Sequence, residues 1–201
     1  MAVSEPRTAK GRATRERIVD IACRLMVEHG VGATSLDDVL AEARVSKSQL
    51  YHYFADKDDL VDAVIDRTVQ GVLDGQPQLA DLSSWKAIRE WFDSLVVLQV
   101  EREARGGCPI GGLASELAEQ RESARRELAD GYARWETPLR QGLAEMKRRG
   151  RLRPGADPAK LATATMAAIQ GGLLLTKTRR DPEQLRMALD AMYVYLRTFA
   201  A

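Results

Sequence analysis

The sequence is poor in the residue types on which disulfide-stabilised and membrane proteins depend. Its 201 residues include only two cysteines, Cys23 and Cys108, which lie far apart and give no disulfide framework. No apolar run approaches the roughly 20 residues that a membrane-spanning helix needs. The opening stretch, MAVSEPRTAKGR, lacks the apolar segment of a signal peptide. We therefore expect a cytoplasmic protein that does not associate with a membrane.

The scarcity of histidine excludes further classes. His29 and His52 are the two histidines, and no set of histidine, cysteine and carboxylate residues has the spacing of metal ligands. No nucleophile, base and orienting group can be proposed together from the sequence. We therefore expect no catalytic residues, no metal and no cofactor. The net charge of +1 does not by itself indicate a nucleic-acid partner.

The chain also lacks the period-two alternation of strands, and it has the composition and spacing of helices instead. Alanine, leucine, arginine and glutamate are abundant, and apolar residues recur at helical spacing. Gly30 ends the first predicted helix, 14–29. Ser35 and Ser46 begin two short helices after it, and Asp56 begins a longer one. The sequence therefore predicts an all-α fold.

Longer helices are predicted for the second half of the chain. They cover 84–102, 113–149 with an interruption near Arg121, about 158–178 and 182–198. The stretch GGCPIGG at 106–112 is predicted to break the chain between the first two of them. Asp157-Pro158 and Asp181-Pro182 each place a capping residue before a proline, and these pairs start the last two helices.

Two short helices joined by a tight turn, behind a longer helix, form the layout of a helix-turn-helix. Residues 45–54, VSKSQLYHYF, contain the second short helix, which in this motif enters the DNA major groove. On this helix Leu50 and Phe54 are four residues apart and point toward the core, while the polar residues lie on the other side. The sequence predicts a three-helix DNA-binding domain at 1–56 and a helical domain at 57–201.

The polar side of this helix has the chemistry of a DNA contact surface. Hydroxyl, ammonium and imidazole groups suit phosphate oxygens, and Gln49 can read adenine through a bidentate pair. Gln49 also completes a capping box with Ser46, so it can equally serve to close its own helix. Tyr53 can pack against the first helix. The candidate DNA contacts from this pattern are Lys47, Ser48, Gln49, Tyr51, His52 and, in the first turn of the next helix, Lys57.

Residues 14–60, TRERIVDIACRLMVEHGVGATSLDDVLAEARVSKSQLYHYFADKDDL, resemble the DNA-binding domain of TetR-type transcriptional regulators. The resemblance lies in the long first helix that ends in glycine, in TSLDDVL, in VSKSQLYHYF and in the lysine that follows. It implies that Thr34 and Ser35 contact phosphates. It also implies that Lys47, Ser48 and Gln49 form the leading turn of the recognition helix, and that Tyr51 and Lys57 hold the DNA backbone.

Two features differ from the pattern of that family. Ser48 stands where many members have glycine, and Asp37 and Asp38 stand where a basic residue is common. Phosphate binding would then depend more on a basic N-terminal arm that reaches an adjacent minor groove. The basic residues of this arm are Arg7, Lys10, Arg12, Arg15 and Arg17.

The C-terminal half resembles the LmrA/YxaF-like branch of the same family, through GCPIGGLASELAEQ, the segment from Trp135 to Pro138, and AAIQGGLLL with the Asp-Pro that follows. This resemblance implies sensing of an aromatic or hydrophobic small molecule. The family resemblance also implies a homodimer through the helices near 158–178 and 182–198. Aromatic residues of the middle helices can enclose an apolar cavity with few polar groups, although each alone is equally an ordinary core residue. The candidate ligand contacts are Trp91, Phe92, Leu95, Cys108, Tyr132, Trp135, Met166 and Gln170.

These features together favour a ligand-responsive regulator that binds double-stranded operator DNA as a homodimer and is released by a hydrophobic or aromatic inducer. Repression is the expected outcome, and activation is also compatible with the sequence. A sensor of oxidants or electrophiles through Cys108 is the alternative, since a thiolate is favoured just before a helix; a buried structural cysteine is the simpler explanation. A non-specific DNA binder fits poorly with a net charge of +1.

Overall fold

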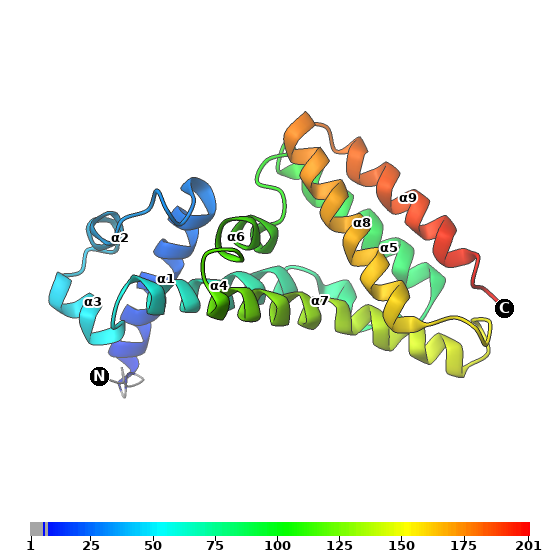
Figure 1. The fold of residues 1–201 in the computed structure, drawn as a ribbon, viewed down its shortest axis with the longest axis horizontal. Coiled ribbons are helices and arrows are strands. Elements are labelled where there is room, and N and C mark those ends of the chain that lie inside the picture. Colours follow the sequence, from blue (N-terminus) through cyan, green and yellow to red (C-terminus); the bar gives the residue numbers. More distant parts are fainter. Residues whose placement is uncertain (1–5, 7) are drawn as a thin grey trace. The chain divides into compact units, whose positions relative to one another are not determined.

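The computed structural model describes residue 6 and residues 8–201. Its α-helices, labelled in Figure 1, are α1 Ala9–His29, α2 Leu36–Ala43, α3 Lys47–Tyr53, α4 Lys57–Asp74, α5 Trp85–Glu101, α6 Pro109–Leu117, α7 Glu122–Arg148, α8 Pro158–Arg179 and α9 Glu183–Arg197. A short 3-10 helix, η1 Pro77–Ala80, lies between α4 and α5. The all-α prediction is confirmed, with one isolated antiparallel bridge between Leu152 and Ala200. Within this described part, none of the helices has the combined length and apolarity needed to cross a membrane.

The described residues form two compact units, and each unit is built from two separate stretches of the sequence. The first, the helix-turn-helix unit, contains the described residues up to Val72 together with Gly112–Gly131. The second, the C-terminal unit, contains Leu73–Gly111 and Tyr132–Ala201. Helices α4, α6 and α7 each contribute residues to both units. The predicted domain boundary between residues 56 and 57 stays a prediction.

Helix α1 begins earlier than the apolar spacing predicts. Thr8 is its N-cap, and the hydroxyl of Thr8 accepts a hydrogen bond from the backbone N–H of Gly11 at 3.0 Å. Lys10 and Arg12 therefore belong to a helix and not to an extended arm. Arg7, the first basic residue of the predicted arm, lies outside the described residues. The first turns of α1 contain no buried residue, so only the polar cap marks their start.

Helices α2 and α3 both begin with reciprocal caps. The hydroxyl of Ser35 accepts from the N–H of Asp38, whose carboxylate accepts from the N–H of Ser35 at 2.9 Å. These hydrogen bonds with Ser35 hold the pKa of the Asp38 carboxyl below its usual range. Ser46 and Gln49 repeat the arrangement in α3. Since helices of eight and seven residues are too short to be stable alone, the caps and the burial of Leu50 are needed to hold them.

The predicted break at 106–112 ends sooner than the run of glycines suggests. Gly106 and Gly107 adopt positive φ angles of 81° and 70° and make the turn. Helix α6 already begins at Pro109, because proline suits the first position of a helix, where its missing N–H is not needed. The interruption predicted near Arg121 is confirmed, since α6 ends at Leu117 and α7 begins at Glu122.

Helices α8 and α9 lie side by side in the C-terminal unit (Figure 1). Asp157 caps α8 through two backbone N–H groups, with Pro158 as the first helical residue, as predicted. Pro182, by contrast, is the N-cap residue of α9 and not its first helical residue. The two helices approach closely at Gly172, where a Cβ would lie 2.7 Å from Cδ1 of Leu185.

Gly142 and Gly71 offer a matched test of the packing. A Cβ at Gly142 in α7 would lie 2.4 Å from the carbonyl oxygen of Leu82, whereas a Cβ at Gly71 in α4 would have nothing within 4 Å. We expect Gly142→Ala to lower the free energy of unfolding by about 1–3 kcal/mol through overpacking. Gly71→Ala should raise it by about 0.5–1 kcal/mol because alanine favours a helix. Urea unfolding followed by circular dichroism measures both, and equal stabilities would contradict the close contact at Gly142.

Candidate DNA-binding surface and ligand-binding region

Helix α3 is anchored by apolar residues on the side opposite its polar surface. Leu50 and Phe54 are fully buried, as their spacing predicts. The guanidinium carbon of Arg15 in α1 lies 5.1 Å from the centroid of the Phe54 ring. Tyr53 is half-buried, and its hydroxyl lies 3.7 Å from where a Cβ on Gly11 would be. Tyr53 therefore packs against α1 and is not part of the exposed surface.

The polar surface of α3 contains most of the candidate DNA contacts. The exposed candidates are Ser35, Lys47, Ser48, Gln49, Tyr51 and His52. The ammonium of Lys47 lies 6.0 Å from the centroid of the Tyr51 ring, so a charge and a phenol are presented together. Arg44, in the left-handed conformation between α2 and α3, is also exposed and was missed by sequence reasoning. Donors of these kinds bind phosphate oxygens and base edges.

Thr34 and Lys57 are engaged inside the helix-turn-helix unit. Thr34 is buried, and its hydroxyl donates to the carbonyl oxygen of Gly30 at 2.8 Å. The ammonium of Lys57 donates to the carbonyl oxygen of Val31 at 2.7 Å. Both side chains therefore shape the loop between α1 and α2, and their contact with phosphate stays a prediction.

Gln49 performs the capping role that its position in Ser-x-x-Gln indicates. Its side-chain oxygen accepts a hydrogen bond from the backbone N–H of Ser46 at 2.9 Å. A bidentate contact with adenine uses both the oxygen and the nitrogen of the amide. While the cap is closed, mainly the NH₂ group of the Gln49 side chain is therefore free for another partner.

A carboxylate that sequence reasoning did not single out holds the loop between α1 and α2. Glu116 of α6 accepts hydrogen bonds from the backbone N–H groups of Val31 at 2.8 Å and Gly32 at 2.5 Å. Hydrogen bonds to a charged acceptor are roughly twice as strong as neutral ones. After the end of α6, Arg121 donates to the backbone carbonyl oxygen of Asp58 at 3.0 Å. Residues of 112–131 therefore help to position the DNA-binding helices within this unit.

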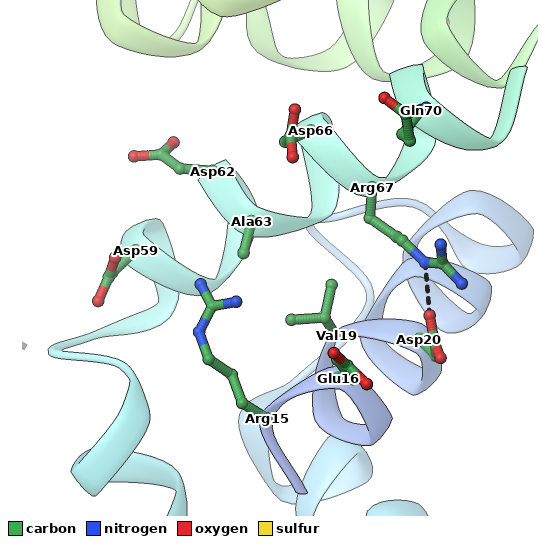
Figure 2. Close-up of a pocket in the computed structure, with 10 residues that line it drawn as sticks. All are labelled: Arg15, Glu16, Val19, Asp20, Asp59, Asp62, Ala63, Asp66, Arg67 and Gln70. Carbon is green, nitrogen blue, oxygen red and sulfur yellow. Dashed lines mark hydrogen bonds and ion pairs between the residues drawn. The ribbon is translucent and has the colours of Figure 1, made fainter. Parts of the chain in front are cut away.

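A groove of about 590 Å³ between α1 and α4 has acidic walls (Figure 2). It is lined by Arg15, Glu16, Val19, Asp20, Asp59, Asp62, Ala63, Asp66, Arg67 and Gln70. Arg67 donates to the carboxylate of Asp20 at 2.6 Å, as Figure 2 shows. Because carboxylates outnumber guanidinium groups here, the groove repels phosphate. Across the residues that the structure describes, no cluster of histidine, cysteine and carboxylate groups could hold a metal ion.

Several candidate ligand residues meet around one buried amide in the C-terminal unit. Trp91 and Trp135 both donate their indole N–H to the side-chain oxygen of Gln76, at 2.9 and 3.1 Å. The ring of Phe92 lies 5.4 Å from that of Trp91, and Leu95 is buried further along α5. Sequence reasoning missed Gln76 because it lies between two helices, where no periodic pattern marks a buried residue.

The remaining candidates form a second, more polar group in the same unit. The hydroxyl of Tyr132 donates to the side-chain oxygen of Gln170 at 3.2 Å, and the amide nitrogen of Gln170 contacts the sulfur of Met166 at 3.6 Å. The backbone N–H of Gly111 donates to the Cys108 sulfur at 3.3 Å. Burial raises the pKa of the Cys108 thiol, and burial together with Cys108 raises the pKa of Tyr132. Both groups are therefore uncharged at neutral pH.

Comparison with known proteins covers both halves of the chain. Residues 18–64 match the family described as bacterial regulatory proteins, tetR family, and residues 85–192 match the tetracyclin repressor-like C-terminal domain. The second match alone covers more than half of the chain.

Relatives match along most of the chain. It is 30% identical over 189 residues to an uncharacterized HTH-type transcriptional regulator in the lacX 3' region of Lactococcus lactis subsp. lactis, over 90% of this chain and 92% of the relative. It is 29% identical to the uncharacterized HTH-type transcriptional regulator YxaF of Bacillus subtilis (strain 168), over 94% of this chain and 98% of the relative. The match to YxaF confirms the resemblance of the C-terminal half. A TetR transcriptional regulator from Chloroflexus aurantiacus J-10-FL shares the fold, with a TM-score of 0.83, 24% identity, and coverage of 96% and 98%.

Replacing Glu116 tests its hold on the loop between α1 and α2. In Glu116→Gln the charged acceptor is lost, so the amide protons of Val31 and Gly32 should exchange with solvent about tenfold faster. Hydrogen–deuterium exchange measured by NMR follows these amides directly. Glu119→Gln removes an exposed carboxylate two residues after α6 and is expected to leave their exchange unchanged. Unaltered exchange in Glu116→Gln would show that the loop is held by other groups.

Proposed function

The chain belongs to the TetR family of bacterial transcriptional regulators, and we propose that it is a dimeric repressor released from a palindromic operator by a hydrophobic or aromatic small molecule. Proteins of this family are regulators and not enzymes. They bind DNA through the helix-turn-helix and carry a C-terminal ligand-binding and dimerisation domain. The observation that carries the proposal is the exposed polar surface of α3. This helix and α2 are both short, and both begin with a side-chain cap.

The base preference that we propose follows from the side-chain groups of α3 that are free to contact DNA. The helix enters the major groove with its N-terminal residues against base edges. Lys47 and the NH₂ group of Gln49 are donors, which match the acceptors of guanine or thymine better than the donor and acceptor pair of adenine. Ser48, Tyr51 and His52 supply phosphate contacts. Because a two-fold dimer meets two half-sites, the operator is a palindrome with half-sites one turn, about 34–36 Å, or a multiple of that apart.

Exposed apolar residues on the last two helices support dimerisation. Leu174 in α8 is 64% exposed and Val194 in α9 is 65% exposed. Leu175, Met187 and Tyr195 of the same helices are also large, apolar and exposed. Covering apolar surface of this kind with a partner removes it from water and so stabilises the assembly. Pairing of α8 and α9 with the same helices of a second copy would make a four-helix bundle.

The buried aromatic residues of the C-terminal unit support an apolar ligand. Trp91, Phe92 and Trp135 provide aromatic surface, and Tyr132 and Gln170 provide the few polar groups that orient a small molecule. An inducer acts by binding more tightly to a conformation with low operator affinity, and it shifts the population by that difference in affinity.

Sensing through Cys108 has less support than ligand binding. A reactive cysteine needs an appreciable thiolate fraction at neutral pH. Burial raises the pKa of the Cys108 thiol, so the thiolate fraction falls below that of an ordinary cysteine. Cys108 is better explained as part of the polar group with Tyr132 and Gln170.

DNA binding tests the first part of the proposal. Operator duplexes are selected by the purified protein from a random pool, and their binding is compared with scrambled duplexes by fluorescence anisotropy at near-physiological salt. We expect a preference of about a thousandfold or more. Lys47→Ala should weaken binding by about tenfold, because a donor to the DNA is lost, and lower the salt slope by up to about one. Lys86→Ala removes an exposed lysine from α5 and should bind as the parent does. Equal, weak binding of both kinds of duplex would overturn site-specific recognition.

A charge placed on α8 tests the dimer. Leu174→Asp should shift the protein from dimer to monomer in size-exclusion chromatography with light scattering, because an unpaired carboxylate would be buried between the subunits. Val27→Asp makes the same change at an exposed apolar residue of α1 and should leave the dimer intact. A Leu174→Asp protein that stays dimeric at micromolar concentration would place the interface elsewhere.

A further inference from the structure

One position on the buried side of α5 is occupied by an amide where an apolar residue is expected. The buried residues of this helix follow helical spacing and are Ile88, Trp91, Phe92, Leu95, Val96 and Gln99. Gln99 is 3% exposed. It lies one turn beyond Leu95 and two turns beyond Phe92, both of which are candidate ligand contacts. The stripe that provides the apolar surface of the candidate ligand region therefore ends in a polar side chain.

Gln99 differs from Gln76 and Gln170 of the C-terminal unit in having no partner for its side-chain oxygen. Gln76 accepts hydrogen bonds from two indoles, and Gln170 accepts one from Tyr132. The side-chain oxygen of Gln99 is buried and has no hydrogen-bond partner among the residues that the structure describes. A buried carbonyl without a donor destabilises a protein until a donor reaches it.

The backbone around Gln99 keeps this amide in the interior. The carbonyl oxygen of Gln99 accepts the N–H of Ala104 at 2.8 Å, and the carbonyl oxygen of Ala104 accepts a hydrogen bond from Arg180 at 3.5 Å. Glu103 and Ala104 adopt positive φ angles of 51° and 56° in the tight turn that follows α5. The turn is thus held to the end of α8, and the end of α5 that carries Gln99 is anchored.

The polar candidate groups of the same unit already have partners. Tyr132 donates to Gln170, Gln170 contacts Met166, and the sulfur of Cys108 accepts from a backbone N–H. The oxygen of Gln99 has both lone pairs available. An apolar molecule that carries one hydroxyl or amine would therefore find its acceptor at Gln99.

We propose that Gln99 selects the inducer by accepting a hydrogen bond from a hydroxyl or amine group on an otherwise aromatic or apolar molecule. This assignment rests on the proposed function, because it requires that the C-terminal unit binds such a molecule. It adds the chemical class of the ligand: a phenol, an alcohol or an amine, as opposed to a hydrocarbon or an ether. A site with a buried acceptor rejects a ligand without the donor, since the acceptor then stays unpaired.

Matched ligands separate the role of the donor from the role of apolar burial. The probes are phenol, 2-naphthol and 4-phenylphenol, each with its methyl and methoxy analogue, and binding to the full chain is measured by isothermal titration calorimetry. We expect the parent protein to bind the hydroxyl compounds at least tenfold more tightly than their analogues. In Gln99→Leu this preference should fall to about twofold or less, while the methyl compounds bind as before. Anisotropy of labelled operator DNA shows whether the same compounds release it.

Two further variants keep the test valid. In Gln99→Met the new side chain has a similar shape and no acceptor of comparable strength. This variant is used in place of Gln99→Leu if the leucine variant fails to bind operator DNA without ligand, which would show that it has not folded. Gln120→Leu changes an exposed glutamine between α6 and α7 and should keep the full preference for hydroxyl compounds.

The outcomes separate this inference from the proposed function. A preference for hydroxyl compounds that survives in Gln99→Leu and Gln99→Met overturns the role of Gln99 but leaves the ligand site in place. Tightest binding of the methoxy compounds shows that the amide presents its NH₂ group inward, and overturns the donor class. If no compound binds and none releases DNA, the proposed response to aromatic ligands fails, and the assignment of Gln99 fails with it.

Discussion

The recognition helix can face DNA only because its own side chains close its first turn while its opposite side is buried. A helix of seven residues cannot stay folded by its backbone hydrogen bonds alone. Ser46 and Gln49 supply the cap, and Leu50 and Phe54 supply the burial. Arg17 of α1 adds a hydrogen bond to the last carbonyl of α2 at 3.3 Å. Gln49 therefore contributes to the stability of the helix, and in the proposed complex with DNA the cap limits which bases its amide can read.

Interior amides play the corresponding role in the C-terminal unit. Gln76 joins two tryptophans from α5 and α7 through a single oxygen, and Gln170 holds Tyr132. Satisfied polar groups of this kind fix the positions of large aromatic side chains that apolar contact alone would leave free to repack. Gln99 has no such partner. Because Gln76 and Gln170 are paired and the oxygen of Gln99 is open, this unit suits the proposed recognition of a polar group on an apolar ligand.

Most of the elements could be predicted because their signals are local. Ser35, Ser46 and Asp157 mark helix starts through side chains that bond within three residues. Three predicted helix starts differ from the structure, each at a place where competing signals are present. Helix α1 begins at the Thr8 cap, ahead of its first buried apolar residue, and α6 begins at Pro109 among glycines. Helix α9 begins one residue later than the Asp-Pro signal predicts.

The sequence by itself determined the all-α class, the order of the helices, the family, and the polar side of α3, because each of these depends on residues close together in the chain. Only the tertiary structure decided which polar groups remain available for DNA or ligand. Thr34 and Lys57 are engaged with the loop after α1, and Glu116 reaches Val31 across 85 positions of the chain. No local pattern encodes such partners, because hydrogen bonds between distant segments form only when packing brings the segments together.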